Sequence, residues 1–281
     1  MKKISSISEL RTIINKWRKN QQSIAFVPTM GNLHDGHISL VEHALSVADR
    51  VIVSIFVNPL QFGIGEDYQT YPRTLEADCE TLEQIGTHLV FTPSVTDIYP
   101  TDTETTTSVI VPGLSKILCG ASRPIFFKGI TTVVNILFNL VQPDKALFGE
   151  KDYQQLLIIK RMVADLFMPI EIIGVPIMRE ADGLAMSSRN HYLNAEQRTI
   201  APQLFQTIDN IKKQIEQGGR QFVQLENQAI SDLTTTGFNP DYIAIRQAQT
   251  LDIPTSADKK LVILAAAWLG KARLIDNIMV G

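Results

Sequence analysis

The sequence has few cysteines: Cys79 and Cys119 are the two among 281 residues. Two cysteines cannot form the disulfide framework of a small secreted domain, and neither stands in a Cys-x-x-Cys pair that would suggest a metal or redox site. We therefore expect both to be small buried apolar residues, and we expect the protein to work in a reducing compartment, the cytoplasm.

The sequence also lacks an excess of charge of one sign. Lys and Arg total 26 and Asp and Glu total 29, which gives a net charge of −3. A general nucleic-acid binder carries a clustered basic excess, so we expect no nucleic-acid partner. Long apolar runs are missing too, because residues 261–269 are the longest candidate and a membrane helix needs about 20 residues. We expect no membrane span, and the polar N-terminal segment lacks the apolar core of a signal peptide.

Short apolar runs alternate with helix-like segments over the first part of the chain. Strands are predicted at residues 24–27, 51–57, 88–91, 145–148 and 171–175, and helices between 27 and 51 and at 71–85, 129–141 and 152–167. This rhythm is typical of βαβ units, and strands that are apolar throughout are buried on both faces. The sequence therefore predicts an α/β fold, with a Rossmann-like doubly wound parallel sheet in a domain of residues 1–176.

The pattern changes after residue 176. Helices are predicted at residues 195–217 and 222–235, and strands at 242–246 and 261–268. Helices followed by strands, without the βαβ alternation, favour a smaller C-terminal α+β domain at residues 177–281.

The segment from Pro28 to His37 reads PTMGNLHDGH and joins the first of these strands to a helix. Ligands of open α/β sheets bind at the carboxyl ends of the strands, and the start of a helix attracts phosphate. Gly31 and Gly36 allow close approach of the main chain to a ligand. His34 and His37 share one face of the first helical turn, where they could stabilise the charge of a leaving pyrophosphate. They could instead cap the helix or bind a metal as a pair, but no third ligand lies nearby, so we assign no metal site.

Several ordered motifs carry a resemblance to known proteins. His34-Asp35-Gly36-His37 resembles the HxGH signature of the nucleotidyltransferase superfamily, and residues 185–190, AMSSRN, resemble its KMSKS-type loop, with the lysines replaced by Ser and Arg. The segments that narrow the family read VPTMGNLHDGH (27–37), SIFVNPLQF (54–62), YPRT (71–74), FGEKDYQQ (148–155), GVPIMR (174–179), DGLAMSSRN (182–190) and RLIDN (273–277). Together they resemble the pantoate–β-alanine ligase family essentially from end to end.

The resemblance implies an ATP-dependent ligase that acts in two steps. ATP and pantoate would give pantoyl adenylate and pyrophosphate, and the amine of β-alanine would then displace AMP to form pantothenate. ATP would be a substrate, and Mg²⁺ would bridge its phosphates without an assigned protein ligand. A homodimer is also implied. The C-terminal domain would act as a lid that carries the KMSKS-like loop.

The resemblance also implies site residues, position by position. The catalytic residues would be His37, as charge stabiliser and candidate proton donor, together with His34, Lys151 and Arg189. Pantoate would contact Asn58, Gln61, Arg123 and Gln155, and Gln61 would also position β-alanine. The ATP site would comprise Met30, Gly31, Asn32, Leu33, His34, Asp35, Gly36, His37, Gly149, Glu150, Lys151, Asp152, Met178, Met186, Ser187, Ser188 and Arg189.

One departure from the family pattern keeps other interpretations open. Ile125 and Phe126 stand where the family has Gly-His before a phenylalanine. We expect an active enzyme with an altered loop. The alternatives are a nucleotidyltransferase of the same superfamily that acts on a different acid, and a catalytically idle nucleotide-binding homologue.

Overall fold

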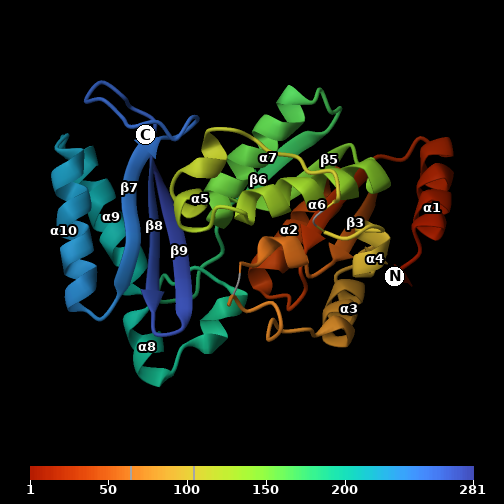
Figure 1. Cartoon of the computed structure of the whole chain (residues 1–281), viewed down its shortest axis with the longest axis horizontal. Helices are drawn as coiled ribbons and strands as arrows, with labels where there is room; N and C mark the ends of the chain where they lie inside the picture. The colour runs from red at the N-terminus through yellow and green to blue at the C-terminus, as the bar shows by residue number, and fades with distance from the viewer. Residues whose placement is uncertain (64, 104) are drawn as a thin grey trace. The chain divides into compact units, whose positions relative to one another are not determined.

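The computed structural model describes residues 1–63, 65–103 and 105–281. They form two compact units, one of residues 1–150 and 158–176 and the other of residues 151–157 and 177–281. The first unit contains a six-stranded sheet in the order β1-β4-β3-β2-β5-β6, in which every strand pair is parallel. Figure 1 labels β3, β5 and β6 of this sheet. The second contains a three-stranded antiparallel sheet in the order β7-β8-β9. The predicted fold class is confirmed.

Helices and strands alternate along the chain up to residue 176. In chain order they are β1 (Lys2–Ile4), α1 (Ile7–Lys19), β2 (Ile24–Thr29), α2 (Asp35–Val47), β3 (Arg50–Ile55), η1 (Pro59–Gln61), α3 (Leu75–Gln84), β4 (Leu89–Phe91), α4 (Val95–Ile98), η2 (Leu114–Lys116), α5 (Cys119–Ser122), α6 (Phe126–Val141), β5 (Lys145–Gly149), η3 (Glu150–Asp152), α7 (Tyr153–Asp165) and β6 (Glu171–Val175). The start of α7, residues 153–157, belongs to the second unit.

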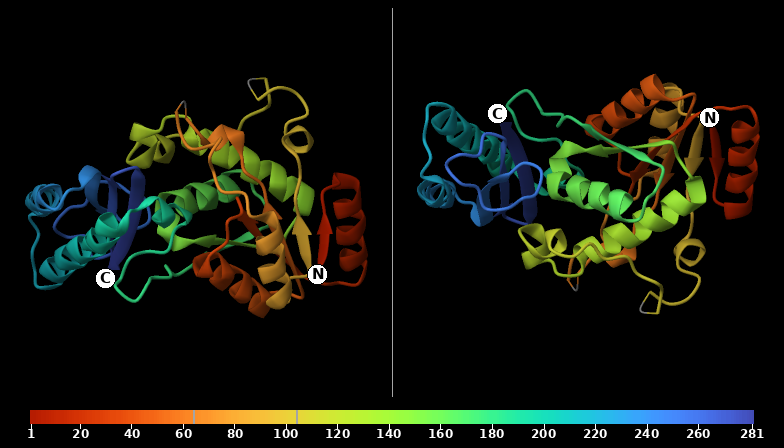
Figure 2. Two further views of the ribbon diagram at one scale, coloured as in Figure 1. Left: turned by 90° about the horizontal axis from the view of Figure 1, so that it is seen from below. Right: turned by 90° about the horizontal axis from the view of Figure 1, so that it is seen from above.

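The central strands are buried because helices cover both faces of the sheet. Alternate residues such as Ala25 and Val27 pack against α2 and α3. The residue between them, Phe26, points to the opposite face, where its ring meets Phe138 of α6 edge-on at 6.3 Å. Figure 2 shows α2 and α3 on one side of the sheet and α6 on the other. The apolar runs that predict these strands are thus explained by burial on two sides.

The carboxyl ends of β2 and β3 lie together at one edge of the sheet. Thr29, the last residue of β2, is in register with Ile55, the last residue of β3. The Phe56 main-chain N–H donates to the Thr29 carbonyl at 3.0 Å, so the two chains leave the sheet side by side. The loops that follow β2 and β3 are therefore neighbours, and the sequence places a predicted site motif on each of them.

The second unit builds a separate core between its sheet and two helices. Its elements after residue 176 are η4 (Ser188–Tyr192), α8 (Ala195–Ile200), α9 (Gln203–Glu216), α10 (Phe222–Thr235), β7 (Asn239–Gln247), β8 (Leu261–Leu269) and β9 (Ala272–Val280). Leu204, Ile208, Ile211 and Ile215 recur at helical spacing along α9 and are buried with residues of all three strands. The helices pack on one face of the sheet (Figure 1).

Several predicted boundaries are wrong in ways that have physical causes. The helix predicted at 195–217 is two helices, because Pro202 has no N–H to continue α8. The helix predicted from residue 71 begins at Leu75, after the Tyr71-Pro72 turn. The strand β9 and the N-terminal β1 and α1 were not predicted. Cys119 is buried as expected, whereas Cys79 is only half-buried.

Among the described residues, no helix is long and apolar enough to cross a membrane.

Candidate active site

The loop after β2 is held in a specific conformation by a carboxylate from α3. Gly31 and Asn32 have φ values of +80° and +51°. The buried Asp78 accepts hydrogen bonds from the main-chain N–H groups of Asn32 and Leu33, both at 2.9 Å. A Cβ atom at Gly31 would lie 3.0 Å from Oδ2 of Asp78, so glycine is required by both the backbone and the space. The sequence motif thus forms a rigid turn at the sheet edge.

His34 and His37 follow this turn at the start of α2. His34 is the N-cap residue: its Nδ1 accepts from the Gly36 N–H at 3.2 Å, and Nδ1 of His37 accepts from the His34 N–H at 3.4 Å. The two rings lie side by side, with centroids 4.1 Å apart. A neutral imidazole whose Nδ1 accepts a hydrogen bond carries its proton on Nε2. In each ring, capping occupies Nδ1 and leaves the Nε2–H group to donate a hydrogen bond. The two histidines can therefore cap the helix and bind phosphate at the same time.

The loop after β3 holds Asn58 and Gln61 in a buried hydrogen-bond network. Nδ2 of Asn58 donates to Oε1 of Gln61 at 3.0 Å and to the Gly129 carbonyl at 3.1 Å. Oδ1 of Asn58 accepts from the hydroxyl of Tyr99 at 2.7 Å and from the Leu60 N–H at 3.3 Å. Burial raises the pKa of Tyr99, so its hydroxyl stays protonated and keeps its role as donor. This pattern fixes the orientation of the Asn58 amide and hence that of the Gln61 amide, whose oxygen faces Asn58.

Arg123 lies next to Gln61 but is already paired. Its guanidinium donates to both oxygens of Glu66, with Nε–Oε1 at 2.7 Å, and Nη2 also donates to the Gln61 carbonyl at 3.1 Å. The guanidinium carbon stacks 3.6 Å from the ring centroid of Phe126, one of the two residues that depart from the family pattern. The apolar substitution at position 126 thus provides an aromatic surface that orients Arg123.

In the second unit, the KMSKS-like loop extends from a short hairpin. Arg179 and Ala185 form an antiparallel bridge, and the Met186 N–H donates to the Met178 carbonyl at 3.0 Å. Ser187 then starts η4, its hydroxyl accepting from the Arg189 N–H at 3.2 Å. The hairpin therefore places Met178 beside Met186, and Arg189 follows three residues later in the chain.

Strand β9 contacts both that hairpin and the segment that contains Lys151. The carboxylate of Asp276 accepts two hydrogen bonds from Arg179, at 2.6 and 2.8 Å. Burial raises the pKa of Asp276, and the hydrogen bonds from Arg179 oppose that rise. The neighbouring Asn277 donates from Nδ2 to the Lys151 carbonyl at 3.0 Å.

The other predicted residues of this region lie where β5 ends and α7 begins. Gly149 is the last residue of β5, and Glu150, Lys151 and Asp152 form the turn η3. Lys151, Asp152 and Gln155 are half-buried. Tyr153 fixes the turn by donating to the Ala248 carbonyl at 2.8 Å.

Within the described ranges, no group of three His, Cys, Asp or Glu side chains is arranged to hold a metal ion. An Mg²⁺ ion bound mainly by phosphates and water needs no such cluster. We assign no protein ligand to Mg²⁺.

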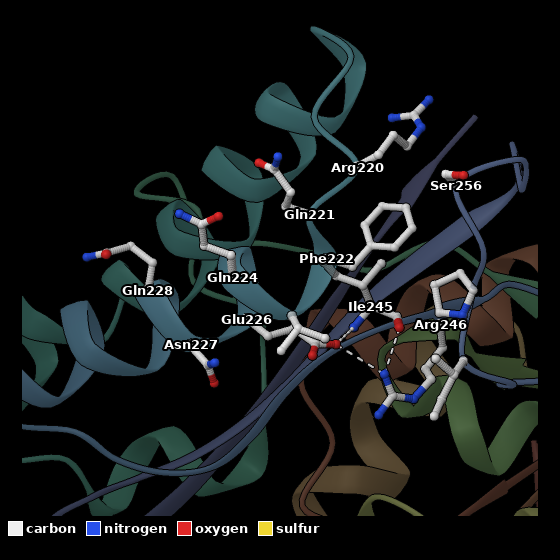
Figure 3. Close-up of a pocket in the computed structure, with 13 residues that line it drawn as sticks. Arg220, Gln221, Phe222, Gln224, Glu226, Asn227, Gln228, Ile245, Arg246 and Ser256 are labelled. Carbon is white, nitrogen blue, oxygen red and sulfur yellow. Dashed lines mark hydrogen bonds and ion pairs between the residues drawn. The ribbon is translucent and has the colours of Figure 1, made fainter.

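A separate cavity lies in the second unit. None of the residues that line it is a predicted site residue. It has a volume of about 820 Å³ and is lined mainly by the start of α10, by the end of β7 and by residues 253–256. Glu226 in its wall accepts hydrogen bonds from the Ile245 N–H and from Nη1 of Arg246 (Figure 3). These residues carry no chemistry that the motifs predict, so we place the candidate active site at the motif-bearing loops instead.

Comparison with known proteins identifies the family to which these motifs belong. The profile of the family described as pantoate-beta-alanine ligase matches residues 2–279. The chain belongs to the pantoate–beta-alanine ligase family. A pantothenate synthetase of Shewanella baltica (strain OS185) is 57% identical over 272 residues, which cover 97% of this chain and 96% of the relative.

Solved structures of the family agree with the fold. A pantothenate synthetase from Thermus thermophilus matches with a TM-score of 0.92 at 44% identity, over 99% of both chains. A pantoate-beta-alanine ligase from Francisella tularensis, complexed with beta-gamma ATP and beta-alanine, matches with a TM-score of 0.84 at 36% identity, over 99% of this chain and 97% of that one. The resemblance to pantoate–β-alanine ligases is therefore confirmed.

The structure adds supporting residues that the motifs alone did not reveal. Asp78 in α3 and Tyr99 at the end of α4 are distant in sequence from the residues whose positions they fix. Glu66 likewise pairs with the distant Arg123. Asp276 and Asn277 lie in the segment RLIDN, which is part of the resemblance but had no role assigned from the sequence. The RLIDN motif is therefore the feature of the sequence that could have indicated a role for Asp276 and Asn277.

Proposed function

We propose that this chain joins pantoate to β-alanine in an ATP-dependent reaction that passes through pantoyl adenylate and releases AMP and pyrophosphate. The observation that carries the proposal is the whole-chain match to pantoate–beta-alanine ligases, including one complexed with beta-gamma ATP and beta-alanine. The residues predicted for each step are present, and their local geometry is consistent with the roles below.

In the first step, a carboxylate oxygen of pantoate attacks the α-phosphorus of ATP. A phosphorus–oxygen bond to the acid forms, and the bond to the pyrophosphate oxygen breaks. Negative charge accumulates on the departing pyrophosphate, and His34 and His37 would donate to it from Nε2–H at the positive end of α2. Lys151 and Arg189 would add positive charge to the same polyphosphate. Met30–Leu33, Gly149–Asp152, Met178 and Met186–Ser188 would bind the rest of the nucleotide.

Pantoate would be held by neutral amides and by their supports. Asn58 fixes the Gln61 amide, whose NH₂ group is then directed to hydrogen-bond acceptors such as hydroxyl or carboxylate oxygens. Gln155 would supply a second amide. Arg123 is neutralised by Glu66 and contacts the Gln61 carbonyl, so we assign it to shaping the pantoate pocket rather than to a free charge on the substrate.

In the second step, the amine of β-alanine attacks the acyl carbon of the adenylate. The amide bond forms, the carbon–oxygen bond to AMP breaks, and a proton leaves the nitrogen. Gln61 would position β-alanine for this attack, because alignment of two bound reactants removes much of the barrier. The C-terminal unit would act as a lid that excludes water from the hydrolysable adenylate. We further propose that the enzyme is a cytoplasmic homodimer that uses Mg²⁺-bound ATP.

The function is tested by mixing the protein with Mg-ATP, pantoate and β-alanine and measuring AMP and pantothenate. We expect AMP release that requires both organic substrates, with pantothenate formed in equal amount. Pyrophosphate release with another acid only would identify a nucleotidyltransferase of different specificity. Nucleotide binding without turnover would identify an idle homologue, as the Ile125-Phe126 departure could suggest.

His37→Ala distinguishes a chemical role from a structural one. We expect adenylate formation to fall at least a hundredfold, because the variant loses a donor aimed at developing charge. Thermal stability should change little, since the capping hydrogen bond from the His34 N–H to Nδ1 of His37 is long, at 3.4 Å. A melting temperature that falls in proportion to activity would contradict this role.

A further inference from the structure

Strand β9 carries two adjacent polar residues that are both buried. Asp276 and Asn277 are each 4% exposed. Neighbouring residues of a strand point to opposite faces, so two adjacent side chains can hold two different segments. Buried polar groups are costly unless they are hydrogen-bonded, which makes the partners of this pair informative.

Asp276 fixes the hairpin that leads into the KMSKS-like loop. Its carboxylate holds both ends of the Arg179 guanidinium, and Nη1 of Arg179 also donates to the Gly183 carbonyl in the hairpin turn at 3.0 Å. The guanidinium stacks 3.9 Å from the ring centroid of Phe205 in α9. Arg179 thus ties the base and the turn of the hairpin to β9, and the loop Ser187–Arg189 follows directly after this hairpin.

Asn277 fixes the segment that carries Lys151. Its Nδ2 donates to the Lys151 carbonyl at 3.0 Å, and the carbonyl of Asn277 itself accepts from Nη2 of Arg179 at 3.3 Å. The positive charge of Lys151 acts on Asp276, where it favours the ionised carboxylate. Two segments that are well separated in sequence therefore meet on consecutive residues of one strand.

We infer that Asp276 and Asn277 are positioning residues that hold the main chain of Lys151 and the base of the Ser187–Arg189 loop at a fixed separation, so that both cations reach one triphosphate. The inference rests on the proposed function, which places Lys151 and Arg189 on the nucleotide. It gives the RLIDN segment a role: Asn277 acts on ATP through Lys151 and touches neither pantoate nor β-alanine.

The test removes the Asn277 donor in two ways. Asn277→Ala deletes the side chain, and Asn277→Leu fills a similar volume without a donor, so a packing defect in one variant does not decide the result. We expect the KM and the Kd for Mg-ATP to rise about tenfold in both, the factor expected from one well-formed hydrogen bond. The Kd for pantoate should change less than about twofold. Gln228→Ala is the matched control, because that amide donates to Asp232 and both residues are exposed on α10.

A double-mutant cycle separates positioning from general stability. If Asn277 acts through Lys151, adding Asn277→Ala to Lys151→Ala should change the Kd for Mg-ATP less than about twofold. A tenfold effect that persists without the lysine side chain, or an equal rise in the Kd for pantoate, would overturn the inference.

The binding measurements also separate this inference from the proposed function. A wild-type protein that binds Mg-ATP but forms no pantothenate would refute the proposed function, and the cycle would still decide the role of Asn277. A wild-type protein that does not bind Mg-ATP would overturn both.

Discussion

The turn after β2 depends on one buried carboxylate, and Asp78→Asn tests that dependence with the smallest change of shape. Asp78 accepts from two main-chain N–H groups, those of Asn32 and Leu33, and from the Thr74 hydroxyl at 3.1 Å. An asparagine has one acceptor oxygen, so its NH₂ group must face one of the two N–H donors. One charge-assisted bond is lost and one buried donor is left unsatisfied.

The size of the effect follows from these contacts. A hydrogen bond to a charged group contributes about 1.5–3 kcal/mol, and an unsatisfied buried donor costs about 1–3 kcal/mol. Together these two contributions predict that Asp78→Asn lowers the free energy of unfolding of the first unit by about 2.5–6 kcal/mol. The kcat/KM for ATP should fall at least tenfold, because Met30–His37 would lose its fixed conformation.

Urea denaturation followed by circular dichroism, together with initial-rate kinetics, measures both quantities. Glu76→Gln is the control, since it makes the same chemical change at an exposed position of the same helix. A free energy of unfolding within about 0.5 kcal/mol of the wild type in Asp78→Asn, or an equal effect in Glu76→Gln, would refute this account of the turn.

Three further substitutions test other parts of the structure. Tyr99→Phe removes the donor to Asn58 and should raise the KM for pantoate about tenfold while the KM for ATP stays within twofold; equal changes in both would contradict the network. Phe126→His, which restores the family residue, should leave pantothenate formation equal or raised, and a large loss would mean that the apolar ring is required. Burial lowers the pKa of His88 below 6.5, so the unfolded chain binds more protons as pH falls, and the melting temperature should decrease from pH 7.5 to 5.5. His88→Gln should reduce this decrease in melting temperature, whereas His43→Gln, at an exposed position, should not. An unchanged decrease in His88→Gln would refute the role of His88.

The sequence predicted the parts of the fold that are encoded by local patterns. The strands β2, β3, β4 and β5 are short apolar runs because both faces of the sheet are covered, and that burial is visible in the residues themselves. In contrast, β1 has three residues and α1 is amphipathic in a polar segment, with Leu10 and Ile14 as its buried residues. Such elements are stabilised by their partners more than by local preference, so a single sequence gives a weak signal for them.

The same distinction applies to the candidate site. The motif His34–His37 was predicted from its residue types and their spacing, whereas Gln61 was predicted from the resemblance to the family. Asp78 and Tyr99 were not predicted, because each acts on a loop more than 40 residues away through a contact that the fold creates. Supporting residues of this kind have ordinary local surroundings in sequence, and their role becomes visible when the hydrogen bonds of the buried groups are followed.

The central claim is that this chain activates a carboxylate as an adenylate. Isotope exchange between pyrophosphate and ATP, measured with pantoate present and β-alanine absent, tests that claim most directly, because exchange requires reversible adenylate formation. We predict exchange that depends on pantoate and is lost in His37→Ala. Exchange that is absent while Mg-ATP binds, or exchange that proceeds equally without pantoate, would contradict it.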